Sequence, residues 1–199
     1  DGIRDKGIKD ERILNAINTI PRHLFMDNAF IQFAYKDKAF PIGSGQTISQ
    51  PYTVALQTQL LDVKSHNKIL EIGTGSGYQA AVLKALDLDV YTIERQKDLF
   101  QKTQEFLPEI GYNCNFFYGD GYKGLPNFAP FDRIIITCGA VEMPSALLSQ
   151  LKLGGKMVVP IGEGGIQVMH LIEKVSEEDH KITTHGKFSF VPMLSDKQS

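Results

Sequence analysis

The sequence predicts a doubly wound α/β domain with a mostly parallel sheet and helices on both faces. From Lys68 onward, short apolar runs alternate with helical patterns, which is typical of a parallel sheet covered by helices. The first of these runs ends in a glycine-rich turn at 73–77. The chain has 199 residues, 42% of them hydrophobic, which suffices for the core of one globular domain. Periodicity leaves the strand order open.

Residues 1–199 are expected to form a single domain. Within it, residues 1–66 should form a mainly helical cover over the core at 67–199. Near the N-terminus, apolar residues recur at helical spacing until Pro21 stops the pattern. These residues are Ile8, Ile13, Leu14, Ile17 and Ile20. A turn-rich stretch at 41–46 is too polar for the core and is expected to pack over another part of the molecule. A second helix is expected to begin near Pro51, because proline is tolerated at the first helical position.

The predicted core follows a regular alternation. Strands are expected at 68–73, 89–94, 115–118, 132–137 and 156–161. Helices are expected at 78–86, 99–107 and 146–151. Pro108 is expected to stop the second of these helices, and Gly154-Gly155 to break the chain before the fifth strand. The run 167–172 and a last segment ending at Val191 predict an antiparallel hairpin at the sheet edge.

Composition argues against several classes of function. The 21 basic and 23 acidic residues give a formal net charge of −2, which provides no basic face for nucleic acid. No signal peptide opens the chain, and no apolar run approaches the roughly 20 residues of a membrane helix. Cys114 and Cys138 lie in apolar runs and are expected to be buried free thiols rather than metal ligands. A monomer in the cytoplasm, without a metal, is therefore expected.

The turn after the first core strand has the features of a nucleoside site. Gly73, Gly75 and Gly77 let the backbone turn sharply and allow a ligand to approach the main chain. The following helix offers free N–H groups to an anionic group. Glu94 ends the next strand about 20 residues later, where an acid accepts hydrogen bonds from ribose hydroxyls. Together these residues predict that a nucleoside binds here.

Three further features indicate which nucleoside. A dinucleotide fingerprint has its third glycine at position 78, where this chain has Tyr78. Glu71, in the strand before the loop, is close enough to attract an ammonium group, although it is equally well an ordinary acid at a strand end. Asp120-Gly121 follows the third strand, where a carboxylate accepts a hydrogen bond from an adenine amino group. This pattern points to S-adenosylmethionine, which combines an adenosine with an amino-acid tail.

The chain resembles the protein-L-isoaspartate O-methyltransferases from about Ile8 to Leu194. The matching motifs are the segments 21–25, 41–43, 45–52, 70–79, 119–122, 129–132 and 190–194. The glycine loop alone indicates only the superfamily, whereas Gln46-Thr47-Ile48-Ser49-Gln50-Pro51 indicates this family. The resemblance implies a Rossmann-like, class I S-adenosylmethionine-dependent methyltransferase. It also implies methylation of the free α-carboxylate of L-isoaspartyl residues in damaged proteins and peptides, with S-adenosyl-L-homocysteine as the other product and repair by way of a succinimide.

The resemblance also implies roles for particular residues. Ser49 corresponds to the family's active-site serine, and its neighbours Thr47, Ile48 and Gln50 are expected to line the junction of cofactor and substrate. The substrate backbone is expected to contact Ile42, Gly43, Val191 and Pro192. The chain departs from the family pattern at 138–141, where the family more often has small alanine-rich residues, and at 188–190, where an arginine is common.

The implied reaction fits these residues. A carboxylate has an ordinary pKa near 4, so at neutral pH it is already an ionised nucleophile and needs no general base. The five histidines, His23, His66, His170, His180 and His185, are scattered along the chain. A hydroxyl at Ser49 is expected to orient the carboxylate by a hydrogen bond. An alternative is that Ser49 or Gln50 caps the helix that begins at Pro51.

The sequence disfavours three other functions. A methyltransferase of the same fold acting on a small metabolite or RNA is disfavoured by the segment 46–51 and by the lack of a basic patch. A nicotinamide dehydrogenase is disfavoured by Tyr78. A binding module that holds the cofactor without turnover is disfavoured by the presence of Ser49, Asp120 and Glu94, and product formation distinguishes it from an enzyme.

Overall fold

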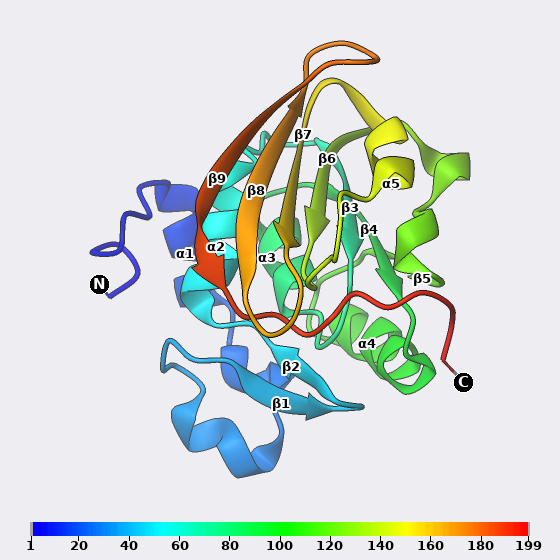
Figure 1. Cartoon of the computed structure of the whole chain (residues 1–199). Coiled ribbons are helices and arrows are strands. Elements are labelled where there is room, and N and C mark those ends of the chain that lie inside the picture. The colour runs from blue at the N-terminus through cyan, green and yellow to red at the C-terminus, as the bar shows by residue number, and fades with distance from the viewer. Residues whose placement is uncertain (1, 199) are drawn as a thin grey trace.

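A seven-stranded sheet forms the centre of the computed structural model, which describes residues 2–198 (Figure 1). Its strands lie in the order β5-β4-β3-β6-β7-β8-β9, and the first five are parallel. The parallel strands are β3 (Lys68–Ile72), β4 (Asp89–Glu94), β5 (Asn115–Tyr118), β6 (Phe131–Ile136) and β7 (Leu151–Ile161). The antiparallel strands β8 (Gln167–Lys174) and β9 (His180–Phe188) extend the edge. The predicted fold class, including the C-terminal hairpin, is confirmed.

Helices cover both faces of this sheet, to different extents. One face packs against α1 (Glu11–Thr19), α2 (Pro51–Leu60), α3 (Tyr78–Ala85) and α4 (Lys97–Glu109). The other face packs against α5 (Ser145–Ser149), the 3₁₀ turns η3 (Gly121–Lys123) and η4 (Pro126–Phe128), and the C-terminal segment around Met193. Strands β3, β4, β6 and β7 carry buried apolar residues on both faces, as expected for parallel strands between two layers.

The cover formed by the first 66 residues is less helical than predicted. After α1 the chain forms η1 (Arg22–Phe25) and η2 (Asn28–Phe33), and then the antiparallel hairpin of β1 (Phe40–Gly43) and β2 (Gln46–Ile48). Gly43, Ser44 and Gly45 have φ values of 95°, 50° and 67°, and this run of left-handed residues turns the polar stretch back on itself. The hairpin lies beside the carboxyl ends of the parallel strands (Figure 1).

Three predicted boundaries in the core are wrong. The helix expected at 146–151 ends at Ser149, because Leu151 already pairs with Phe131 as the first residue of β7. Gly154-Gly155 does not break the chain but lies inside β7, where the register shifts and Gly154 has a φ of 74°. Pro108 does not end α4, which continues to Glu109.

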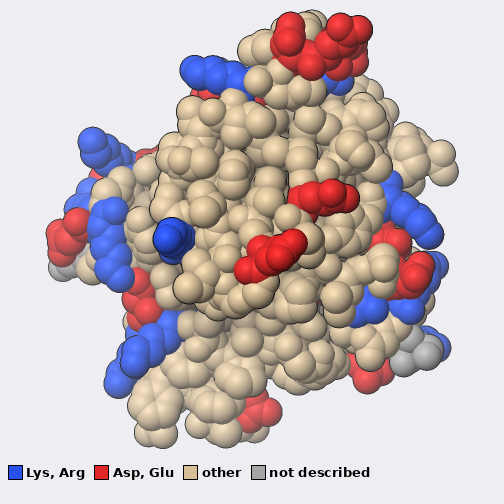
Figure 2. Space-filling view, in the orientation of Figure 1, with Lys and Arg blue, Asp and Glu red and all other residues tan. Residues whose placement is uncertain are grey.

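Charged residues are distributed around the molecule without forming one large patch on the face shown in Figure 2. Most Lys and Arg lie in separate groups around the rim of this face, and a few charged side chains lie nearer its middle. Acidic residues gather at the tip of the β8–β9 hairpin, which contains Glu177, Glu178 and Asp179. Between residues 2 and 198, no helix is long and apolar enough to cross a membrane. Within the same range, no group of three or more His, Cys, Asp or Glu side chains is placed to hold a metal ion.

Candidate active site

The strand order reverses next to β3, which has β4 on one side and β6 on the other. Ligands of open α/β sheets bind at such a reversal, beyond the carboxyl ends of the strands. Here hydrogen bonds connect the residues at the ends of β3 and β6. The Thr137 hydroxyl lies 2.9 Å from the Ile72 carbonyl and 2.7 Å from the Gly73 carbonyl, and the Thr137 N–H also donates to Ile72. These bonds fix the start of the glycine loop against the end of β6.

The glycine loop follows directly from β3 and leads into α3. Gly73, Gly75 and Gly77 have φ values of 95°, 53° and 83°, so each adopts a conformation that side chains disfavour. A Cβ at Gly77 would lie 2.7 Å from a Thr103 side-chain carbon, and one at Gly73 would lie 2.7 Å from the Thr137 hydroxyl. The loop is therefore packed closely against α4 and the end of β6.

Glu94 holds this loop from the end of β4. Its side chain is 5% exposed, and its two oxygens accept hydrogen bonds from the N–H groups of Gly75 and Gln96, each at 2.8 Å. Burial raises the pKa of Glu94, and the hydrogen bonds from the backbone oppose this effect. Glu94 also lines the cavity beside the loop, and its contact with a ribose stays a prediction.

Glu71 lies below the loop and not in the cavity. Its side chain is fully buried on the face of β3 that meets the α1–α4 layer, and its Oε2 atom accepts a 2.6 Å hydrogen bond from the Thr92 hydroxyl. Thr92 in turn lies 2.6 Å from the hydroxyl of Thr74 in the loop. Burial raises the pKa of Glu71 to about 8. The predicted contact with the cofactor's ammonium group remains untested, and the structure instead connects Glu71 to the loop through two threonines.

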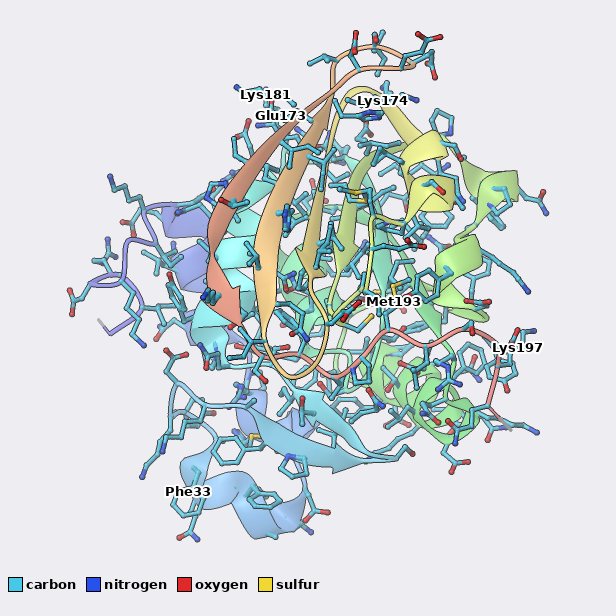
Figure 3. All side chains as sticks on the ribbon, viewed as in Figure 1. Phe33, Glu173, Lys174, Lys181, Met193 and Lys197 are labelled. Carbon is cyan, nitrogen blue, oxygen red and sulfur yellow. The ribbon has the colours of Figure 1, made fainter. Side chains whose placement is uncertain are left out.

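A second cavity adjoins the first on the side of β4. It shares four residues with the first cavity, namely Gln46, Gly73, Glu94 and Cys138. Its other lining residues include Gly121 and the C-terminal Pro192 and Met193, and Figure 3 shows Met193 where the last segment crosses the strand ends. Asp120 is 7% exposed beside this cavity, and its carboxylate accepts the Tyr122 N–H at 2.9 Å. The predicted pair Asp120-Gly121 therefore lies at the far end of the site from the serine segment.

A third cavity lies on the opposite side, between the serine segment and the end of β9. Its volume is about 750 Å³, and its wall includes Tyr52, Phe188 and Phe190. Ser49 lines both this cavity and the one beside the glycine loop, as do Thr47, Thr137 and Val191. Ile48 and Gln50 each line one of the two. The segment 47–50 therefore forms the boundary between the two cavities.

The side chains of Ser49 and Gln50 do not cap α2. Gln50 occupies the N-cap position without a side-chain hydrogen bond, and its carbonyl accepts the N–H of Val54 at 3.2 Å. A distant residue supplies the cap, because the Asp37 carboxylate accepts the Tyr52 N–H at 2.8 Å. The alternative role for Ser49, helix capping, is thus already filled by Asp37.

The four residues expected to hold the substrate backbone are separated in the structure. Val191 lines the first and third cavities, whereas Pro192 lines the second. The Val191 carbonyl is occupied by the Gly139 N–H at 2.8 Å. Ile42 lies on β1 and faces Gly75, and Gly43 is exposed in the hairpin turn. Only Val191 therefore borders the large cavity.

Several residues that line the cavities were not predicted as site residues. Among them are Lys6, Gln46, Tyr52, Gln79, Arg95, Thr137, Cys138, Lys187, Phe188 and Met193. The position of Thr137-Cys138 directly after a predicted parallel strand was a usable signal, because carboxyl ends of such strands meet at one edge. Both cysteines are free and half-buried, and burial raises the pKa of the Cys138 thiol to about 12.

The donors and the space at this site fit S-adenosylmethionine. The glycine loop gives close access to the main chain, where a Cβ at Gly73 would not fit, and Glu94 places a carboxylate at the wall. The adjoining cavities extend from Gly121 at one end to Ser49 at the other. Together with the strand order, these features define a class I S-adenosylmethionine-dependent methyltransferase.

Comparison with known proteins agrees with this class. The family model for protein-L-isoaspartate(D-aspartate) O-methyltransferase matches residues 1–198. A protein-L-isoaspartate O-methyltransferase of Flavobacterium psychrophilum is 56% identical over 196 residues, which cover 98% of this chain and 92% of that protein. One of Dictyoglomus thermophilum is 46% identical over 192 residues, covering 96% and 87%. The chain belongs to the protein-L-isoaspartate O-methyltransferase family.

Solved structures support the same assignment. A protein-L-isoaspartate O-methyltransferase superposes with a TM-score of 0.86 at 28% identity, covering 96% of this chain and 63% of that one. A Plasmodium falciparum protein described under the same enzyme name, in complex with S-adenosyl-L-homocysteine, gives a TM-score of 0.83 at 25% identity, covering 97% and 95%. The predicted family, methyltransferase class and cofactor are thereby confirmed.

The buried position of Glu71 predicts a pH-dependent stability. Its pKa of about 8 in the folded protein exceeds its ordinary value of 4.5, so its contribution to stability is complete below pH 4.5 and is lost as pH rises through 8. Glu71→Gln keeps the shape of the side chain without titrating. The melting temperature of this variant minus that of the wild type should therefore increase from pH 5 to 8 and then level off.

Thermal unfolding followed by circular dichroism across this pH range measures the effect. Glu105→Gln, the same change at an exposed position of α4, is the matched control and should show no such trend. A difference between Glu71→Gln and wild type that stays constant from pH 5 to 9 would contradict the prediction.

Proposed function

We propose that this chain methylates the free α-carboxylate of L-isoaspartyl residues in damaged proteins and peptides, with Ser49 orienting that carboxylate. The observation that carries the proposal is the position of Ser49. It lies on the boundary between the cavity of the glycine loop and the large cavity beside β9. A residue at this boundary is placed to contact a cofactor from one side and an acceptor from the other.

The cofactor is proposed to lie along the first two cavities. Glu94 accepts hydrogen bonds from the ribose, Asp120 and Gly121 border the adenine, and Gly73 and Gly75 face the amino-acid tail. S-adenosylmethionine supplies an activated methyl group on a sulfonium. The chain's own contribution is to hold the loop in place, which Glu94 does at Gly75 and Thr137 does at Gly73.

The acceptor is proposed to lie in the large cavity. Its volume suits a peptide side chain with part of the backbone. Lys6 and Lys187 line this cavity, and the described residues along its wall include no Asp or Glu. The Lys6 ammonium is paired with the Asp37 carboxylate at 2.6 Å, so Lys187 supplies the positive charge without such a partner in the wall. The charge of Lys187 favours an anionic group in this cavity, as an isoaspartyl residue with its free carboxylate would present. Phe188 and Phe190, where the chain departs from the family pattern, supply apolar wall.

The reaction requires alignment more than proton transfer. The acceptor carboxylate is ionised at neutral pH, so the Ser49 hydroxyl donates a hydrogen bond to it and keeps its own proton. Orienting two reactants in this way is worth roughly 7 to 11 kcal/mol of the barrier when it is complete. In the methyl ester product, the amide nitrogen of the next residue attacks the ester carbonyl and methanol leaves. The resulting succinimide hydrolyses in part to normal aspartate.

The partners and setting follow from this proposal. The macromolecular partners are damaged proteins and peptides, without a role for nucleic acid or a membrane. We further propose that the chain acts as a monomer in the cytoplasm, which agrees with its two free cysteines.

The proposed reaction can be tested directly with a peptide substrate. The purified chain should release S-adenosyl-L-homocysteine from S-adenosylmethionine with a peptide that contains one L-isoaspartyl linkage. The matched control is the same peptide with an L-aspartyl linkage, which should give no turnover. If neither peptide is methylated while calorimetry shows cofactor binding, the proposed substrate is wrong.

Ser49→Ala tests the proposed role of the serine. Loss of one hydrogen bond to a charged group costs about 1.5–3 kcal/mol, so kcat/KM on the isoaspartyl peptide should fall roughly 10- to 100-fold. Affinity for S-adenosyl-L-homocysteine, measured by calorimetry, should stay close to wild type. Ser44→Ala, at an exposed position of the hairpin turn, is the control. Unchanged turnover in Ser49→Ala would give Ser49 a structural role only.

Glu94→Ala tests the proposed ribose contact. Removal of the Glu94 carboxylate also leaves the Gly75 N–H without its acceptor. Loss of the ribose contact and of this loop contact should together weaken S-adenosyl-L-homocysteine binding roughly 10- to 100-fold. Glu94→Gln keeps one oxygen that can accept the Gly75 N–H and should bind with intermediate affinity. Isothermal titration calorimetry on the three proteins is the measurement. Wild-type affinity in Glu94→Ala would place the ribose elsewhere.

A further inference from the structure

Arg22 is a buried cation held by backbone carbonyls. Its side chain is 2% exposed, and its guanidinium donates to the carbonyls of Ala34, Lys38 and Ser49, the last two at 3.0 Å. A buried charge is costly unless hydrogen bonds and nearby groups compensate it. Among residues 2–198, Nε has no hydrogen-bond partner, so the arrangement keeps a polar atom unsatisfied. A side chain retained at that cost needs a reason beyond filling space.

The surroundings of Arg22 connect three parts of the site. Its Cζ atom lies 5.9 Å from the centre of the Phe40 ring and 5.6 Å from that of Tyr78. Phe40 begins β1 of the cover, and Tyr78 is the first residue of α3, directly after the glycine loop. Ser49 lies in the segment between the two cavities. One side chain therefore contacts the cover, the glycine loop's helix and the main chain of the serine.

We propose that Arg22 is a positioning residue, which fixes the main chain of Ser49 relative to the glycine loop and thereby the direction of the Ser49 hydroxyl. This inference rests on the proposed function of Ser49. The planar guanidinium suits the role, because its donors point in fixed directions and its faces contact aromatic rings. The ammonium group of a lysine carries the same charge but does not provide this geometry.

A second buried arginine gives a matched control. Arg133 on β6 is 9% exposed and donates to the carbonyls of Leu61, Asp62 and Asp132 at 2.6, 3.0 and 2.8 Å. It has the same chemistry as Arg22 but holds the far end of α2. Arg133→Lys therefore measures how much stability is lost when a buried guanidinium that binds backbone carbonyls is removed at a position away from Ser49.

The test is a double-mutant cycle with Ser49→Ala. Arg22→Lys and Arg133→Lys should both lower the melting temperature, and only Arg22→Lys should lower kcat on the isoaspartyl peptide, by roughly tenfold. In the Ser49→Ala background, Arg22→Lys should change kcat by less than about twofold, because the hydroxyl that it positions is absent. Equal losses in both backgrounds, or an equal loss of kcat in Arg133→Lys, would overturn the proposal.

Hydrogen exchange supplies a readout that is independent of activity. Arg22→Lys should speed amide exchange in the segment 46–52 without ligand, whereas Arg133→Lys should not. If Arg22→Lys does not fold, Phe40→Leu removes one aromatic face from the guanidinium and should give the same changes at smaller size. Unaltered exchange in 46–52 for a folded Arg22 or Phe40 variant would contradict the inference. Because Ser49→Ala is measured alone, failure of the serine's proposed role is seen separately.

Discussion

The site depends on the reversal of strand order beside β3. Strands β4 and β5 are added on one side of β3, and β6 and β7 on the other, so the loops after β3 and β6 diverge and leave space between them. Thr137 closes the base of that space by bonding to the carbonyls of Ile72 and Gly73. The glycine loop, Glu94 and the serine segment all take their positions relative to this base. The cover then closes the site from the side of the strands' carboxyl ends (Figure 1).

The order of elements could be predicted from the sequence because each core element carries its own signal. Residues 89–94 and 115–118 were predicted as strands with the bounds that the structure gives, since apolar and β-branched runs end there at clear turns. The break predicted at Gly154-Gly155 was wrong, because the sequence does not show which backbone atoms lie next to a glycine in the fold. A Cβ at Gly155 would lie 2.7 Å from the carbonyl oxygen of Lys152 and 3.0 Å from that of Asp132 on β6. The glycine pair, which resembles a break in the sequence, is therefore part of a bulged strand.

The site was predicted where residues are close in sequence and missed where they meet through the fold. Gly73, Gly75, Gly77 and Glu94 follow two consecutive strands, and their proximity was therefore evident. The cap on α2 was not, because Asp37 reaches Tyr52 across 15 positions of the chain. Burial also cannot be read from a motif. Glu71 belongs to the segment that identifies the cofactor loop, yet the fold encloses it completely below that loop.

The buried polar groups around the site share one kind of task. Glu94 holds the Gly75 amide, Glu71 reaches Thr74 through Thr92, and Arg22 holds the Ser49 carbonyl. Each is expensive to bury, and each is attached to main chain or to a residue of the loops that border the cavities. A reaction between a ready-made nucleophile and an activated methyl group gains little from a general base and much from fixed geometry. Buried polar groups that restrain the backbone therefore favour the reaction even though their burial costs free energy of folding. A displacement of the glycine loop or of the serine segment would separate the two reactants.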